Sequence, residues 1–165
     1  MYDQSDRPED WLEKFVFKHE NHIYRTALAI MGNKADAEDI MQDVFLKIVE
    51  GKAPDFESEA HETAWLTRVT VNQCRSRFRS FWWRNSEPLL DTYPAEDKKQ
   101  DELMKTVLTL PLKYRTVIYL FYYEGYSTKE IAEITKQKEP TVRSLLSRAR
   151  HMLKDHLEED NNEEI

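Results

Sequence analysis

Two short helical patterns between Leu110 and Lys154 constrain the fold of this 165-residue chain more than any other feature. The first opens at Ser127, where the sequence Ser-Thr-Lys-Glu fits a capping box at the start of a helix. The second opens at Pro140 after a short break, and its apolar residues recur at helical spacing. Such a pair predicts a helix-turn-helix, a module that places its second helix in the major groove of DNA.

The outward face of the second helix, Pro140–Lys154, carries the residue types that contact DNA. Arginines read guanine edges or bind phosphates, and serines allow close approach. A residue near the start of the helix can also meet a phosphate through the helix end. The predicted DNA-binding set on this helix is Thr141, Arg143, Ser144, Ser147 and Arg148.

A second cationic helix is predicted upstream, from Thr63 to about Trp83. Residues 63–85 contain five arginines and no acidic residue. One stripe of its helical wheel contains Arg68, Asn72, Arg75 and Arg79. A solvated face usually mixes both signs of charge, so we interpret the stripe as a DNA contact with Asn72 as base reader, and a plain solvated face is the alternative. Trp65, at the rim of the stripe, could stack on an unpaired base or pack in the core.

The predicted helix Lys34–Glu50 has an apolar side and an acidic side. The acidic side and the residues next to it contain Asp36, Asp39, Gln42, Asp43 and Leu46. Carboxylates beside an exposed leucine are typical of a protein-docking surface, and a solvated acidic face is the alternative. Carboxylates at this spacing could hold Mg²⁺, but no ligand loop accompanies them, so we predict no metal.

Charge is distributed unevenly along the chain, whose net charge is −7. Residues 1–62 and 155–165 are acidic, whereas residues 63–85 and 111–154 are basic. A generic nucleic-acid coat would be basic throughout, because phosphate neutralisation drives non-specific affinity. The acidic stretches should repel DNA, so we expect the free chain to bind DNA weakly without help.

Several function classes are not supported by the sequence. No apolar run is long enough for a membrane span, and the first residues lack a signal-peptide pattern. The single cysteine, Cys74, excludes an internal disulfide and a cysteine-based metal cluster. We find no nucleophile–base pair and no glycine-rich phosphate loop, so we predict neither an enzyme nor a cofactor. The cytoplasm is the expected compartment.

Glycine and proline divide the chain into helical segments without a strand pattern. The stretch 85–100 contains two prolines and no apolar period, so it reads as a flexible linker. We predict an all-α fold of two small helical domains, residues 1–84 and 101–157, the second a helix-turn-helix. The acidic end of the chain, Asp155–Ile165, is expected to fray, and residues 158–165 form an acidic tail outside both domains.

The order of these motifs resembles the extracytoplasmic-function class of bacterial RNA polymerase sigma factors. The resemblance covers about Tyr24–Leu153, and its most specific stretches are Ala37–Phe45, Trp65–Asn72, Leu110–Arg115 and Glu130–Arg150. The chain departs from the family at Ser76 and Pro140, where aspartate and glycine are frequent. A stand-alone helix-turn-helix regulator is the alternative, but it leaves the arginine stripe unexplained.

The resemblance implies a protein that binds core RNA polymerase and directs initiation at promoters with −35 and −10 elements. It implies that the acidic helix docks on the β′ coiled coil and that the second domain reads the −35 element and meets the β flap. The family's flipped-base loop aligns with Phe56–Ala60, which adds Phe56, Ser58 and Ala60 to the predicted −10 contacts. An anti-sigma factor, in this family often membrane-anchored, is a further implied partner. No small-molecule substrate is implied.

Overall fold

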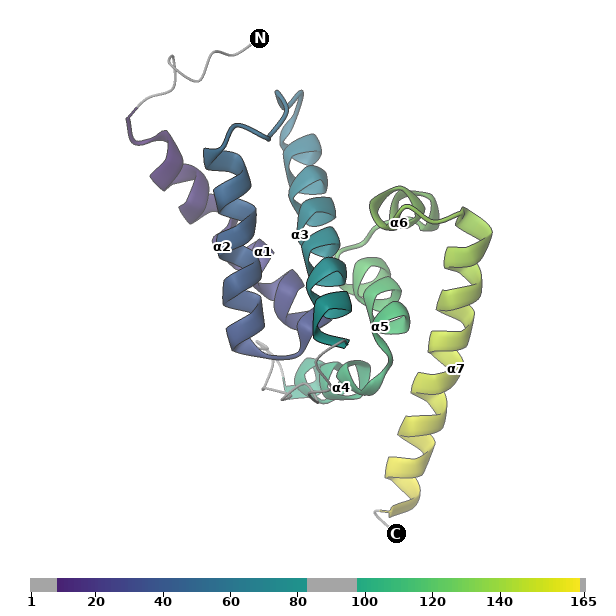
Figure 1. The fold of residues 1–165 in the computed structure, drawn as a ribbon. Coiled ribbons are helices and arrows are strands. Elements are labelled where there is room, and N and C mark those ends of the chain that lie inside the picture. Colours follow the sequence, from purple (N-terminus) through teal and green to yellow (C-terminus); the bar gives the residue numbers. More distant parts are fainter. Residues whose placement is uncertain (1–8, 83–97, 164–165) are drawn as a thin grey trace.

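The structure, a computed structural model, describes residues 9–82 and 98–163, and every regular element in those ranges is helical (Figure 1). The elements in chain order are α1 (Trp11–Met31), α2 (Lys34–Val49), α3 (Glu59–Trp82), α4 (Lys98–Thr109), α5 (Leu112–Ile118), the π-helical turn η2 (Tyr119–Tyr123), α6 (Thr128–Thr135) and α7 (Glu139–Glu163). The predicted all-α fold is confirmed, and no strand occurs in the described ranges.

The N-terminal domain consists of α1, α2 and α3, which pack against one another around an apolar core. Gly32 ends α1 in the left-handed conformation, at φ 83°, as its position after the last apolar residue predicts. The Asn33 side chain then accepts a hydrogen bond from the Asp36 N–H at 2.8 Å and caps α2. These two local signals fix the α1–α2 turn and direct the apolar face of α2 inward.

The third helix begins four residues earlier than the sequence predicts. Ser58 caps it, because its hydroxyl oxygen accepts a hydrogen bond from the His61 N–H at 3.1 Å. Glu59 and Glu62 lie in the first turn, where carboxylates interact favourably with the positive end of the helix dipole. The loop that the family resemblance predicts at Phe56–Ala60 is therefore shorter than expected. Ala60 lies on the helix and not in the loop.

The C-terminal domain contains α4 to α7, with α7 packed against α5 and α6. Its capping box is present: Ser127 accepts from the Glu130 N–H at 3.1 Å, and the Glu130 carboxylate accepts from the Ser127 N–H at 2.8 Å. Lys136, at φ 54°, ends α6 in the left-handed conformation. The predicted helix-turn-helix is therefore formed by α6 and α7.

Two boundaries of this domain differ from the sequence prediction. The fourth helix begins at Lys98, inside the predicted linker 85–100, and the linker residues up to 97 lie outside the described ranges. The predicted acidic tail is helical as far as Glu163, because α7 continues to that residue, and its fraying stays a prediction. No glycine or proline follows Pro140, so the sequence contains no residue that would end the helix.

Removing the Ser127 hydroxyl should destabilise the chain modestly. We expect Ser127→Ala to lower the free energy of unfolding by about 1 kcal/mol, because the Glu130 N–H loses its cap. Urea denaturation followed by circular dichroism measures this change. Ser147→Ala, an exposed position within α7, serves as the control and should leave the midpoint nearly unchanged. Equal midpoints for both variants would contradict a stabilising role of the capping box.

The two domains contact each other directly. Helix α3 lies beside α6, and α1 lies beside α4, α5 and η2. Figure 1 shows α7 on the outer side of the C-terminal domain, away from α1 and α2. This mutual packing could not be predicted from the sequence, and it determines which of the predicted surfaces are accessible.

Candidate DNA and polymerase interfaces

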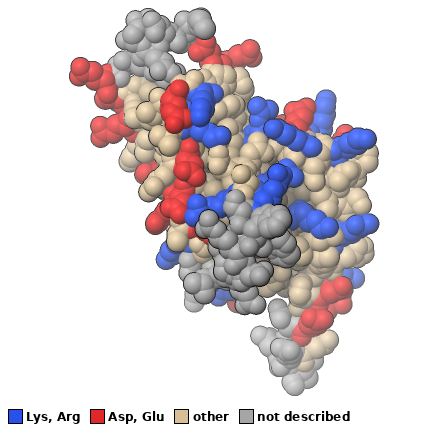
Figure 2. Space-filling model, in the orientation of Figure 1, with Lys and Arg blue, Asp and Glu red and all other residues tan. Residues whose placement is uncertain are grey.

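The arginine stripe lies on the side of α3 that faces away from the core of the N-terminal domain. Arg68 and Arg79 are exposed, whereas Val71 and Cys74 on the opposite side are fully buried. Asn72, the predicted base reader, is half-buried. In Figure 2 basic side chains gather between the α3 and α7 regions, and acidic side chains form a band over the α2 side. The predicted orientation of the stripe is therefore confirmed, while its contact with DNA stays a prediction.

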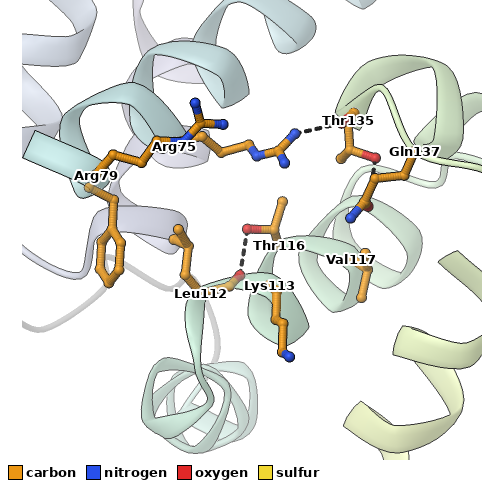
Figure 3. A pocket seen from close by; sticks show the side chains of 9 residues that line it. Arg75, Arg79, Leu112, Lys113, Thr116, Val117, Thr135 and Gln137 are labelled. Atoms are coloured by element: carbon orange, nitrogen blue, oxygen red, sulfur yellow. Dashed lines mark hydrogen bonds between the residues drawn. The ribbon is translucent and has the colours of Figure 1, made fainter. Parts of the chain in front are cut away.

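Part of this stripe is covered by the C-terminal domain. The Arg75 guanidinium donates a hydrogen bond to the Thr135 carbonyl, at the end of α6, at 2.5 Å (Figure 3). Burial lowers the pKa of Arg75, and the nearby charge of Arg79 lowers it further. A cavity of about 210 Å³ lies beside this contact, lined by both domains. Arg75 is thus bound to the chain itself, an arrangement that the helical wheel could not indicate.

The predicted loop residues lie at the beginning of the same helix. Phe56 is half-buried and packs edge-on against Trp65, with ring centroids 5.7 Å apart, while Ser58 and Ala60 are exposed. This contact favours a packing role for Trp65 over base stacking, the two alternatives that its position left open. The loop therefore leads directly into α3, the helix that carries the arginine stripe.

The acidic surface of α2 forms as predicted, with one unpredicted partner. Ala37, Ile40, Val44 and Ile48 are buried, whereas Asp39, Gln42 and Asp43 are exposed. Leu46 is 55% exposed, and Val49, which the sequence reasoning missed, is 54% exposed. The surface thus combines carboxylates with two exposed apolar side chains.

Arg77 of α3 neutralises part of that surface. Its guanidinium contacts Asp36 at 2.9 Å and Asp39 at 2.7 Å. Asp43, which is exposed, makes no ion pair with any described residue, so its charge is not neutralised in this way. Among the described residues no group of side chains could hold a metal ion.

All five predicted DNA-binding residues of the second helix of the helix-turn-helix are exposed on α7, and its apolar positions face inward. Arg143 donates to the Glu139 carboxylate at 2.7 Å, and Thr128 of α6 donates to the same oxygen at 2.9 Å. These contacts hold the pKa of Glu139 below its usual value, with the Thr128 hydrogen bond as the largest cause. Glu139 thus orients Arg143 at the start of α7.

The geometry agrees with the comparisons to known proteins. Residues 15–84 match the family model of sigma-70 region 2, and residues 100–153 match that of sigma-70 region 4. The chain is 30% identical over 141 residues to the ECF RNA polymerase sigma factor SigM of Mycobacterium tuberculosis (strain H37Rv), covering 82% of this chain and 71% of SigM. The chain belongs to the extracytoplasmic-function RNA polymerase sigma factors.

Other relatives of the sigma factor support the same family assignment. SigW of Bacillus subtilis (strain 168) is 27% identical over 172 residues, covering 90% of both chains. The fold is similar to the sigma factor RpoE of Bartonella quintana, solved in complex with the anti-sigma factor NepR, with a TM-score of 0.74 and 20% identity over 90% of this chain and 98% of that one.

The sigma factor directs promoter-specific transcription, and a stand-alone regulator is not favoured. Members of its family bind core RNA polymerase and promoter DNA. The family is not one of catalytic enzymes. In the described part of the sigma factor no helix is long and apolar enough to cross a membrane.

Region 4 of the sigma factor also has an apolar groove that the sequence reasoning missed. The groove has a volume of about 360 Å³, and its apolar lining includes Leu103, Val107, Ile118, Leu153 and Leu157. It lies between α4, the end of α5, η2 and α7, and the part of α7 beyond the predicted helix end contributes Leu157 to it. The repeat of Leu153 and Leu157, four residues apart, is the signal that could have revealed it.

Proposed function

We propose that three surfaces of the sigma factor divide the work of initiation. The acidic surface of α2, with Asp36, Asp39, Gln42, Asp43 and Leu46, docks on the β′ coiled coil of core RNA polymerase. The −10 element is opened and read by Phe56, Ser58, Ala60, Arg68, Asn72, Arg75 and Arg79. The −35 element is read by Thr141, Arg143, Ser144, Ser147 and Arg148. Residues 1–84 and 101–157 act as separate functional units.

One observation carries this proposal. Two cationic faces lie on different domains, on α3 and α7, and both face away from the core of their own domain. A single helix-turn-helix needs only one such face, because its second helix alone enters the major groove. The acidic α2 beside α3 is unsuited to DNA, since phosphates repel carboxylates, and it is suited to a protein partner.

Two further partners are supported by the exposed apolar surfaces. The groove lined by Leu103, Leu153 and Leu157 offers an apolar site for the β flap, because an exposed apolar cleft of this kind is typical of a protein-binding surface. An anti-sigma factor is supported by the similar fold of RpoE, which was solved with NepR. The proposed compartment is the cytoplasm, where polymerase acts, and the proposed activity is binding without catalysis.

Transcription with and without core RNA polymerase tests the function. Purified chain and core polymerase are incubated with a library of promoter fragments, and the 5′ ends of the transcripts are sequenced. We expect discrete start sites preceded by a shared pair of elements only when both proteins are present. We also expect the chain alone to retard none of these fragments in an electrophoretic shift. Tight, specific binding by the chain alone would instead support a stand-alone regulator.

A further inference from the structure

The cavity beside Arg75 is lined by cationic side chains from both regions. It has a volume of about 210 Å³ and lies between α3, α5 and the end of α6 (Figure 3). Arg75 and Arg79 line it from α3, and Lys113 lines it from α5. No aspartate or glutamate is among the described residues that line it. The cavity therefore gathers positive charge without a carboxylate to balance it.

The three cations of the cavity differ in this respect from their neighbour Arg77. Arg77 is paired with two carboxylates of α2, whereas Arg75, Arg79 and Lys113 form no ion pair with a residue in the described ranges. Burial lowers the pKa of Arg75, and the charge of Arg79 lowers it further, so the two guanidinium groups repel each other. A cleft lined by one sign of charge focuses its field and attracts a counter-ion. The electrostatics of the cavity therefore favour an anionic ligand.

The end of α6 supplies hydrogen-bond donors that are already oriented. The Thr135 hydroxyl lies 3.0 Å from the side-chain oxygen of Gln137, and this contact orients the amide. Figure 3 shows the amide nitrogen of Gln137 turned away from that contact and into the cavity. The bond of Arg75 to the Thr135 carbonyl uses one of the five N–H donors of a guanidinium and holds the group against α6. The other donors can reach the oxygen atoms of a bound anion.

The rest of the lining is apolar and leaves room for more than a bare anion. Phe78 of α3 lines the cavity together with Leu112 and Val117 of α5. A cavity of about 150 Å³ accommodates benzene, so the larger cavity here can hold a small ring together with part of a charged group. A few polar groups that orient the ligand and an apolar lining that covers the rest of it are typical of a small-molecule site.

We propose that this cavity binds a small phosphate monoester that carries a planar ring. Arg75 and Arg79 donate to the phosphate oxygens, which match the fork of a guanidinium, and the ring contacts the apolar lining. A phosphate group carries up to two charges and three terminal oxygens, so it balances several cations better than a carboxylate does. Figure 3 shows the Lys113 ammonium directed away from Arg75, and its flexible stem allows it to turn towards a bound phosphate. The site depends only on these side chains and not on the assignment of α3 to the −10 element.

Amide NMR of the isotope-labelled full chain, titrated with phenyl phosphate, tests the site. We expect saturable shifts concentrated at residues 112–117 and 135–137, with a Kd of about 1 mM or tighter. Benzoate carries the same ring with a single charge, and inorganic phosphate lacks the ring. Each should bind about 10-fold more weakly, because it loses either charged hydrogen bonds or the apolar contact.

Variants on the region 4 side of the cavity show whether the ligand occupies it. Gln137→Glu keeps an oxygen beside Thr135 but places a negative charge in the cavity, so it should weaken binding at least about 10-fold. Lys113→Gln removes the cation of α5 and should weaken binding several-fold. Lys129→Gln and Arg68→Gln remove exposed cations of α6 and α3 that do not line the cavity, and both should leave the Kd unchanged. Circular dichroism checks that every variant is folded.

The outcomes distinguish a built site from general attraction of phosphate to a basic surface. Binding of phenyl phosphate that Gln137→Glu weakens and Arg68→Gln leaves intact supports the proposal. Equal affinity of the folded Gln137→Glu variant and the unaltered chain would overturn it, as would equal affinities for phenyl phosphate, benzoate and inorganic phosphate. Equal losses for Arg68→Gln and Gln137→Glu would overturn it as well, because the phosphate would then follow the whole basic face of α3, as a DNA backbone would.

Discussion

Replacing Asp39 and Asp43 with lysine is expected to weaken binding of the sigma factor to core RNA polymerase by about 100-fold. Both carboxylates are exposed on α2, and Asp43 has no ion-pair partner among the described residues. Like charges brought together in an interface cost several kcal/mol, and 100-fold corresponds to about 2.7 kcal/mol. The fold should survive, because the exposed Asp39–Arg77 pair contributes at most about 1 kcal/mol. Fluorescence anisotropy with labelled chain measures the affinity.

A matched charge reversal controls for the change in net charge. Glu9→Lys with Glu13→Lys adds the same charge at exposed positions near the start of α1 and should leave core affinity nearly unchanged. Leu46→Ala tests docking without any charge, and it should also weaken binding because an apolar contact is lost. Normal affinity for the Asp39/Asp43 variant and for Leu46→Ala would mean that the acidic face is only solvated.

Arg143→Ala and Asn72→Ala are expected to damage different steps of promoter recognition. Losing one good base contact costs about 1–3 kcal/mol, so each variant should lose discrimination at one element only. Arg143→Ala should weaken use of the −35 element and spare a promoter whose −10 region is already open. Asn72→Ala should show the reverse pattern. Open-complex formation on duplex and pre-opened templates, each with either element altered, provides the measurement.

The Arg143 contact with Glu139 refines this experiment. Arg143→Lys keeps the charge but loses the planar fork that reads a base edge, so it should behave like alanine if Arg143 reads a base. If Arg143 only binds phosphate, lysine should restore binding. Glu139→Gln removes the carboxylate that orients Arg143 and should give a smaller loss at the same element. Equal losses for the Asn72 and Arg143 variants on every template would contradict the division of labour.

Local signals predicted the parts of the fold that local chemistry determines. Gly32 ends α1 and the Ser127 capping box opens α6 as their places in the sequence predict, because caps and turns depend on neighbouring backbone groups. The start of α3 was misplaced because Glu59 and Glu62 are polar enough to read as loop. The end of α7 was misplaced because an acidic stretch without glycine or proline can still form helix.

Contacts between helices could not be predicted in the same way. Arg77 lies off the arginine stripe, and only the packing of α3 against α2 brings it to Asp36 and Asp39. Arg75 was correctly placed on the stripe, but its bond to Thr135 depends on how the domains meet.

The burial of Arg115 is a further feature that could not be predicted from the sequence. It belongs to one of the stretches that carried the family resemblance, yet it is only 4% exposed and donates to the Leu108 and Leu110 carbonyls at 3.3 and 3.5 Å. Burial lowers its pKa to about 10. Arginine is rarely so buried, so residue type alone would have placed it at the surface.

The connection between the domains limits the promoters that this protein can use. Fifteen residues separate Trp82 at the end of α3 from Lys98 at the start of α4, and the sixteen steps between these two residues reach at most about 55 Å. The bodies of the two domains must cover the rest of the distance between the elements. Each base pair inserted between those elements adds about 3.4 Å along the duplex and also rotates one site relative to the other. The length of the connection therefore sets an upper limit on the number of base pairs between the −35 and −10 elements.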